Sequence, residues 1–295
     1  MLTLFAIPKA FHGHNEIIQI NAIRSWLALD PRPEIILLGK DEGTAEVASK
    51  LGVKHIANVE CNEYGTPLVS SIFSIAHDAA RYPLLCYINA DIILLSDFLP
   101  AIQQVERQSY LIIGQRRDID LTELIDFETP DWEARLRDLV KEKGKLHPPT
   151  GIDYFVFPRG LYRNIPPFAV GRTAWDNWLV YQARKLKASL IDATGSITAV
   201  HQNHDYSHHP QGEVAVWKGP EAIRNLELRG GPDNGFTLEE ANWVLTPRGI
   251  KRALSMRRFY FQMRAIPVLH PKLHFMMALF RAFEKLLITV RSWRV

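Results

Sequence analysis

Two polar residues, Asn89 and Asp91, interrupt an apolar run that extends from residue 84 to residue 95. A short run rich in Ile and Leu is typical of a strand that is buried on both faces. An Asn and an Asp at the carboxyl end of such a strand are unfavourable unless other groups pair with them. Ligands of open α/β sheets bind at this end of the strands, and a carboxylate there suits Mg²⁺ or Mn²⁺ bound to phosphate oxygens. The alternative is that Asp91 only caps a turn.

The tripeptide Asn89-Ala90-Asp91 resembles the Asp-x-Asp signature of glycosyltransferases with the GT-A fold, in a family-2-like pattern. The resemblance covers roughly residues 1–210 and is one of pattern and order. It implies that Asp91 binds a divalent metal, which holds the diphosphate of a UDP- or GDP-linked sugar. It also places the first residue of the signature near the ribose and the metal. That residue is Asn89 here, where the family usually has Asp.

Residues 201–209 hold four His and one Asp, far above the average of a chain with 11 His in 295 residues. They follow a predicted strand at the place where, by the same resemblance, many GT-A enzymes supply a His as a further metal ligand. Imidazole suits Mn²⁺ well enough to join Asp91. Either His201 or His204 is the expected ligand, and an incidental run of surface His is the alternative. No Cys pair accompanies the run, so its spacing does not match a closed structural zinc site.

The resemblance also implies a nucleotide site beyond the first two predicted strands. A loop with Pro8, Lys9 and Phe11 follows the strand at residues 2–7, and in the family this loop embraces the nucleobase and the ribose. Lys9 and Phe11 are the candidates for contacts with phosphate and base. Asp41 lies just past the second strand, where the family often holds the base with an acidic residue. Capping of a helix is the alternative for Asp41.

Thr66 and Pro67 predict the start of a helix, with Thr66 as the cap and Pro67 at the first helical position. A helix N-terminus that faces the carboxyl edge of a sheet can bind phosphate or sugar hydroxyls through its free N–H groups. Thr66 is therefore a further candidate for the nucleotide site, and an ordinary helix start is the alternative.

The segment from 151 to 179 is similar in order and spacing to the acceptor side of GT-A enzymes. In that family a loop beneath the acceptor leads into a helix that begins with Glu-Asp, and the Asp is the catalytic base. Asp176 matches this Asp, and Trp175 replaces the Glu. A helix N-terminus favours the charge of a carboxylate, which can accept a proton from the attacking hydroxyl and so give inversion. The alternative is that Asp176 caps the helix or pairs with Arg172.

Other residues of this segment are candidates for binding the acceptor or the sugar. Asp153 is the competing carboxylate and could also bind sugar hydroxyls. Trp175 and Trp178 suit the apolar faces of sugars, although each could equally belong to the core. Arg172, just before the predicted helix, completes this group.

The spacing of apolar residues predicts alternating strands and helices. The predicted strands are residues 2–7, 34–38, 53–56, 84–88, 110–114, 154–157, 189–191 and 197–200. The predicted helices are 16–29 with Asn15 as its cap, a helix ending near 51, 66–80, 98–107, 131–143 and 173–186. This alternation predicts an α/β fold with a mostly parallel sheet and helices on both faces. The resemblance narrows it to a GT-A, Rossmann-like, mixed sheet.

Three regions are expected along the chain. Residues 1–215 form the catalytic domain, with a nucleotide-sugar half at 1–115 and an acceptor half at 116–215. Residues 216–245 form a lid, because a long stretch rich in Gly, Pro, Asn and Asp inside a compact domain is usually functional or disordered. Residues 246–295 form a basic helical tail.

The tail carries most of the imbalance of charge. From Pro247 onward lie eleven of the 35 Lys and Arg but one of the 32 Asp and Glu, so the tail carries about +10 and the rest about −7. Residues 273–290 combine apolar residues at helical spacing with basic ones, as in an interfacial helix or a helix that packs on another subunit. Each basic residue near an anionic leaflet adds roughly 1 kcal/mol. A peripheral membrane location and a lipid-linked acceptor are therefore expected, and packing of the tail on its own domain is the alternative.

Other classes of protein fit the sequence less well. The body is acidic and has no recognisable nucleic-acid-binding motif. Two Cys imply no disulfide framework, the N-terminus lacks the features of a signal peptide, and no apolar run is long enough to span a membrane. A cytoplasmic location follows, on the inner face of the membrane if the tail binds there. A sugar-phosphate nucleotidyltransferase would need a Gly-rich loop with Arg, which residues 8–13 lack, and a non-catalytic sugar- or nucleotide-binding protein is the other alternative.

Overall fold

A nine-stranded mixed sheet forms the centre of the structure, a computed structural model that describes residues 1–204, 217–277 and 280. The strand order is β13-β12-β10-β6-β9-β4-β1-β2-β3, and all neighbours are parallel except β4–β9, β9–β6 and β12–β13. The bounds are β1 Leu2–Ala6, β2 Glu34–Leu38, β3 Lys54–Ile56, β4 Leu84–Ile88, β6 Tyr110–Ile113, β9 Tyr154–Pro158, β10 Ser189–Asp192, β12 Trp243–Thr246 and β13 Gly249–Arg252. The predicted α/β class with a mostly parallel mixed sheet is confirmed.

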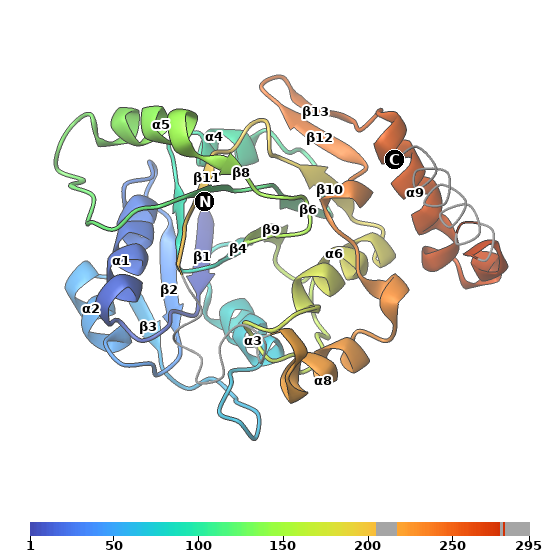
Figure 1. The fold of residues 1–295 in the computed structure, drawn as a ribbon, viewed down its shortest axis with the longest axis horizontal. Coiled ribbons are helices and arrows are strands. Elements are labelled where there is room, and N and C mark those ends of the chain that lie inside the picture. The colour runs from blue at the N-terminus through green and yellow to red at the C-terminus, as the bar shows by residue number, and fades with distance from the viewer. Residues whose placement is uncertain (205–216, 278–279, 281–295) are drawn as a thin grey trace, which may run out of the picture.

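Helices cover both faces of this sheet (Figure 1). Side chains alternate along β1, so that Leu4 enters one hydrophobic core and Phe5 the other. The first core is completed by α1 (Gly13–Leu27), α2 (Thr44–Leu51) and α4 (Phe98–Gln103). The second is completed by α3 (Val69–Ala79), α6 (Trp175–Lys185) and α9 (Met256–Leu269).

A second, four-stranded sheet was not foreseen from the sequence. Its order is β5-β11-β7-β8, with β5 at Ile92–Leu94, β11 at Ala199–Gln202, β7 at Arg117–Ile119 and β8 at Lys145–Leu146. Helix α5 (Trp132–Lys143) packs on it. The chain leaves the main sheet at the end of β4 and enters the small sheet as β5. The turn with Asn89 and Asp91 therefore lies where the two sheets meet.

Two predicted helix starts are wrong. Helix α1 begins earlier than expected, with His12 and not Asn15 at its N-cap. Helix α3 begins at Val69, and Thr66 lies upstream of it. The backbone N–H of Thr66 donates to the side chain of Asn62, and this turn stabilises the segment before the helix.

The main sheet extends beyond residue 215, where the catalytic domain was expected to end. Strands β12 and β13 join its edge, and α8 (Pro220–Leu228) lies within the predicted lid. Helix α9 packs on the same domain, because Ala265 is buried and Arg258 pairs with Asp192. This part of the tail therefore follows the alternative of packing on its own domain.

Parts of the predicted tail helix and of the His run, residues 281–290 and 205–209, lie outside the described residues. Within the described ranges, none of the helices combines the length and the apolar character that crossing a bilayer requires.

Candidate functional site

The site begins at the turn between β4 and β5. The backbone N–H of Ile92 donates to Asn89 O at 3.2 Å, which closes the turn around Asp91. The N–H of Asn89 donates to Asp153 O at 2.9 Å, and its side-chain amide donates to Asp153 Oδ1 at 2.7 Å. The backbone and the side chain of Asn89 thus both fasten the turn to the segment before β9.

Asp91, His201 and His204 come together at this turn. His204 Nε2 lies 3.1 Å and His201 Nε2 3.9 Å from Asp91 Oδ2. One ligand atom from each of the three residues lies within 4.8 Å of the others. Asp91 Oδ1 is buried and has no hydrogen-bond partner among the described residues. The structure therefore brings both candidate His to Asp91, where the sequence left the choice between them open.

The charges around Asp91 keep it ionised. Burial opposes the ionised form, but the hydrogen bond with His204 and the positive charges of His201, His204 and Lys9 outweigh it and hold the pKa of Asp91 well below its usual range. Burial also opposes the charged form of His201 and on its own would lower the pKa of this imidazole. The contacts with Asp118 and Asp91 outweigh burial, so the pKa of His201 is raised. Lys9, from the predicted phosphate loop, thus lies close enough to Asp91 to act on its charge.

Strand β11 positions His201. Neighbouring side chains of a strand point to opposite faces, so His201 faces Asp91 while Gln202 is buried. The amide of Gln202 donates to Ile18 O at 2.8 Å and to Asp91 O at 3.0 Å, and its oxygen accepts from Asn21 Nδ2 at 3.0 Å. Sequence reasoning missed Gln202 and Asn21. Asn21 lies within the apolar pattern of α1, whereas Gln202 lies in a polar run that offers no such signal.

The backbone between the two His is also fixed. Asn203 N–H donates to Ile119 O at 2.8 Å, and its side chain donates to Asp120 Oδ1 at 2.8 Å. His14 Nε2 lies 3.0 Å from Asn203 O, which connects this segment to the first turn of α1. His204 therefore follows a backbone that is held from two sides.

A chain of charged groups surrounds the far side of His201. Asp118 contacts His201, Arg116 and His147, and Arg116 also pairs with Asp153. Both oxygens of Asp153 are engaged, one by Arg116 and the other by Asn89. Apart from Asp153, these residues were not predicted, because three short strands distant in sequence bring them together.

Asp176 lies in the first turn of α6, as predicted. Burial raises its pKa to about 6, and the negative charge of Asp153 adds to the shift, while hydrogen bonds from the backbone and the charge of Arg229 oppose it. The pairing of Asp176 with Arg172 that the sequence left open does not occur. Arg172 instead donates to Glu221 of α8 at 2.9 and 2.6 Å, so it fastens α8 to the loop before α6.

Three aromatic residues predicted to bind ligands lie in the core. Trp175 is 6% exposed and packs edge-on against Tyr87, and Trp178 is 7% exposed. Phe11 is 6% exposed, and a Cβ on Gly43 would lie 2.8 Å from Phe11 Cβ. These rings leave little surface for a sugar or a base, and their burial favours the core alternative for the two Trp.

The other predicted nucleotide-site residues are spread along the carboxyl edge of the sheet. Pro8 is buried, and the backbone of Lys9 exchanges two hydrogen bonds with Gln19 at 2.6 and 2.9 Å. Asp41 is exposed after β2, and its carbonyl accepts the N–H of Thr44 at 3.1 Å at the start of α2. Thr66 lies in the turn before α3. The structure brings Lys9 to Asp91 and leaves the others as separate positions.

No protein-family model matches the sequence, and no curated protein sequence matches it significantly. Similar solved structures include glucosyl-3-phosphoglycerate synthase from Mycobacterium tuberculosis in complex with Mn²⁺, UDP-glucose and phosphoglyceric acid, with a TM-score of 0.48 and 17% identity over 79% of this chain and 80% of that chain. They also include GalNAc-T7 with UDP, GalNAc and Mn²⁺, with a TM-score of 0.49 and 13% identity over 78% of this chain and 48% of that chain. A third similar structure is S. aureus TarS 1–349, with a TM-score of 0.42 and 12% identity over 69% of this chain and 58% of that chain. Because these TM-scores are below 0.5 and the identities are low, neither activity nor ligands are inferred from them.

The raised pKa of Asp176 predicts how stability depends on pH. The folded protein holds this proton up to about pH 6, whereas the usual value is 3.8. The folded state therefore binds more protons between these values, and its stability falls as the pH rises through them. Asp176→Asn should raise the free energy of unfolding at pH 8 by about 1–2 kcal/mol, less than the full shift because Asp176 is only half-buried. At pH 4 the gain should vanish.

Urea unfolding of both proteins at the two pH values measures this difference. Asp138→Asn is the control, because Asp138 is exposed on α5 and its substitution should change stability little at either pH. An equal gain at pH 4 and pH 8 would contradict the assignment of the raised pKa to Asp176.

Proposed function

We propose that this protein is a metal-dependent glycosyltransferase that moves a sugar from a UDP- or GDP-linked donor to a hydroxyl acceptor. The observation that carries the proposal is the cluster of Asp91, His201 and His204 at the carboxyl edge of a mostly parallel sheet. A second carboxylate, Asp176, has a raised pKa and lies on a separate helix. A metal-binding group and a titratable group in one active site are what metal-assisted group transfer to a hydroxyl requires.

The three residues fit a divalent cation. Ligand atoms about 2.1 Å from one ion lie roughly 3 to 4 Å apart, and the two imidazole nitrogens lie 3.1 and 3.9 Å from Asp91 Oδ2. Asp91 Oδ1, which has no partner among the described residues, offers a further ligand atom. A mixture of imidazole and carboxylate suits Mn²⁺ better than Mg²⁺, which prefers oxygen. When bound, the cation would act as a Lewis acid on the diphosphate that leaves.

Lys9 supports the same assignment on the donor side. Its positive charge acts on Asp91, and its backbone is held by Gln19. In this position the ammonium group can pair with diphosphate oxygens that bind next to Asp91. We assign Lys9 to the donor diphosphate and keep Pro8, Asp41 and Thr66 as the outer part of the nucleotide site.

Asp176 is the better candidate for the base. Each oxygen of Asp153 is held by a donor, Arg116 or Asn89, which keeps Asp153 suited to positioning and to binding sugar hydroxyls. Asp176 has a pKa of about 6, so it is mostly ionised at neutral pH and still basic enough to take a proton. We infer that Asp176 removes the proton from the acceptor hydroxyl as that oxygen attacks the anomeric carbon. This direct attack inverts the anomeric configuration.

Asn89 supports catalysis over a non-catalytic binding role. Its amide donates to the carboxylate of Asp153 at 2.7 Å, which an ionised Asp in its place could not do. Asn89, which replaces the first Asp of the Asp-x-Asp pattern, thus has a specific hydrogen-bond partner in Asp153. This pairing accounts for the replacement without loss of a catalytic signature.

Substitution of Asp91 should abolish metal-dependent nucleotide binding. Wild-type protein should show a rise in thermal midpoint with UDP or GDP that depends on Mn²⁺, because a ligand of the native state stabilises it. Asp91→Ala should lose this rise while it remains folded. Asp138→Ala, on the exposed face of α5, is the control. Asp97 is unsuitable for this purpose because its carboxylate pairs with Arg137 and Thr198. No shift with any nucleotide in the presence of Mn²⁺ would contradict the proposed donor site.

Substitution of Asp176 should remove turnover but leave donor binding intact. We expect Asp176→Asn to lower kcat at least about 100-fold, the scale of general-base catalysis, with the Mn²⁺-dependent shift by nucleotide unchanged. The wild-type rate should fall as the pH drops below about 6, where Asp176 takes up a proton. NMR of the product anomer tests inversion, and retention of configuration would exclude Asp176 as the base of a single displacement.

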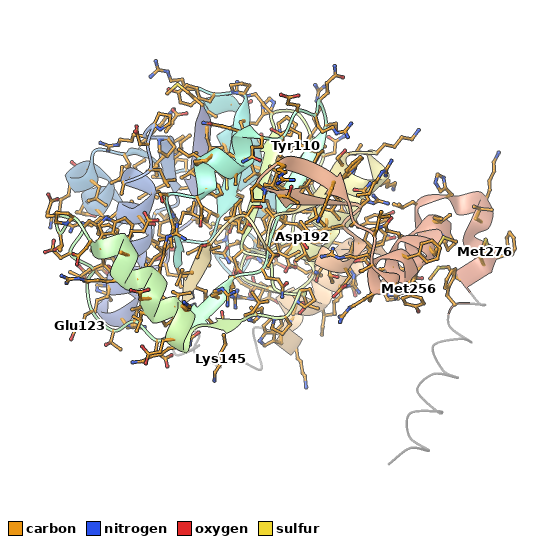
Figure 2. The ribbon with its side chains drawn as sticks, turned by 90° about the horizontal axis from the view of Figure 1, so that it is seen from above. Tyr110, Glu123, Lys145, Asp192, Met256 and Met276 are labelled. Atoms are coloured by element: carbon orange, nitrogen blue, oxygen red, sulfur yellow. The ribbon has the colours of Figure 1, made fainter. Side chains whose placement is uncertain are left out.

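We further propose that the acceptor is lipid-linked or lies near a membrane, as in the synthesis of an envelope polysaccharide or glycolipid. Leu254, Met256 and Phe259 are 91%, 84% and 59% exposed at the start of α9. Lys251 and Arg252 precede them in β13 and are exposed. In Figure 2 Met256 lies on the side of the molecule opposite Glu123, and Met276 lies farther out on the same side. Exposed apolar residues flanked by cations suit an anionic lipid surface.

Vesicle flotation tests this membrane surface. The full chain should float with vesicles that contain phosphatidylglycerol, weakly with phosphatidylcholine alone, and less as salt rises. Serine at 254, 256 and 259 should reduce flotation severalfold. Serine at Leu124, Leu186 and Ile223, which are 56%, 46% and 52% exposed elsewhere, is the matched control. Equal flotation of both triple variants would contradict a role for the 254–259 surface.

A further inference from the structure

Asp118 lies next to the candidate metal site but is not one of the three clustered residues. Its Oδ1 lies 3.1 Å from His201 Nδ1 and accepts from Arg116 Nε at 2.8 Å. Its Oδ2 lies 2.7 Å from His147 Nδ1. The carboxylate is therefore surrounded by three basic side chains, one of which belongs to the site.

The strand pairing explains why Asp118 faces His201. Strands β7 and β11 run parallel, and Asp118 and His201 are direct partners in their register. Partners in a register project on the same face of a sheet. The small sheet thus fixes the carboxylate beside the imidazole without help from a loop.

The two nitrogens of the His201 ring face different carboxylates. Its Nδ1 faces Asp118, and its Nε2 faces Asp91 at 3.9 Å. A His that binds a metal through Nε2 must keep its proton on Nδ1, and an acceptor at Nδ1 fixes both this tautomer and the plane of the ring. Nδ1 of His201 is buried and has no well-aligned hydrogen bond among the described residues, and Asp118 Oδ1, 3.1 Å away, is the carboxylate oxygen within reach of it.

Asp118 is itself held in place. Arg116 connects it to Asp153, because the same guanidinium pairs with both carboxylates. His147 approaches Asp118 next to Gly151, where a Cβ would lie 2.4 Å from the imidazole of His147. Glycine at 151 therefore leaves the room that this imidazole needs to reach Asp118.

We propose that Asp118 is a positioning residue that holds His201 as the Nδ1–H tautomer, with Nε2 directed at the metal. The proposal deepens the proposed function and rests on the metal site of Asp91, His201 and His204. Asp118 binds no metal and touches no substrate in this role. It acts through His201 alone, while Arg116 connects Asp118 to Asp153.

Mn²⁺ affinity of the metal-free full-length protein tests the proposal without reliance on turnover. Free Mn²⁺ is measured by electron paramagnetic resonance for the wild type, Asp118→Asn, Asp118→Ala and His201→Ala. Loss of a partner of this kind weakens metal affinity by about 10- to 100-fold, and we expect this loss for Asp118→Ala. Asp118→Asn should lose less, because the amide oxygen can still accept from Nδ1–H. Asp138→Asn, an exposed change of the same charge, should bind as the wild type does.

The tautomer of His201 provides a readout that a merely structural role would not change. In ¹⁵N-labelled protein at a pH where His201 is neutral, the wild type should show Nδ1–H, and Asp118→Ala should show a mixture with Nε2–H. An Asp118→Ala protein that binds Mn²⁺ within twofold of the wild type, while His201→Ala does not, would overturn the positioning role and leave the metal site standing. A wild type that binds no Mn²⁺ would overturn both. If Asp118→Ala does not fold, Asp118→Asn decides by its Mn²⁺ affinity, which should be measurably weaker than that of the wild type because an amide oxygen is a poorer acceptor than a carboxylate; an unchanged affinity would overturn the positioning role.

Discussion

One buried amide connects the elements that meet at the candidate site. Gln202 donates to the carbonyls of Ile18 and Asp91 and accepts from Asn21, so it joins β11, α1 and the β4–β5 turn. A buried amide that lost one of these partners would leave polar atoms unpaired at about 1–3 kcal/mol each. This penalty selects one register of β11. A shift by one residue would turn Gln202 toward the site and His201 into the core.

The carboxylates around the site lie in different environments. Asp91 meets basic side chains and stays ionised, whereas the half-buried Asp176 has little compensation and its pKa is raised to about 6. Asp153 has both oxygens engaged, one by Asn89 and the other by Arg116. Environments this different suit Asp91 to bind a cation, Asp153 to hold a ligand and Asp176 to carry a proton.

Sequence reasoning identified seven of the nine strands of the main sheet from their apolar residues, and it missed β12 and β13, which lie in the predicted lid and tail. It singled out Asp91 because a polar residue follows an apolar run, and His201 and His204 because His is concentrated after a predicted strand. It could not identify Asp118, because its partners Arg116, His147 and His201 come from separate segments that only the pairing of the small sheet brings together. It left Trp175 open between a sugar and the core, because an aromatic ring at a helix start suits both. Only the packing of that ring against Tyr87 distinguishes the two.

The two edges of the nine-stranded sheet have a further consequence for how the protein behaves when crowded. Edge strand β3 has three residues and includes Lys54, whose ammonium donates to Ala79 O at 2.9 Å. The opposite edge, β13, presents exposed Lys251 and Arg252. Short edges with cationic side chains disfavour the addition of a strand from another molecule. A sheet this wide is thus protected at both ends against edge-to-edge aggregation.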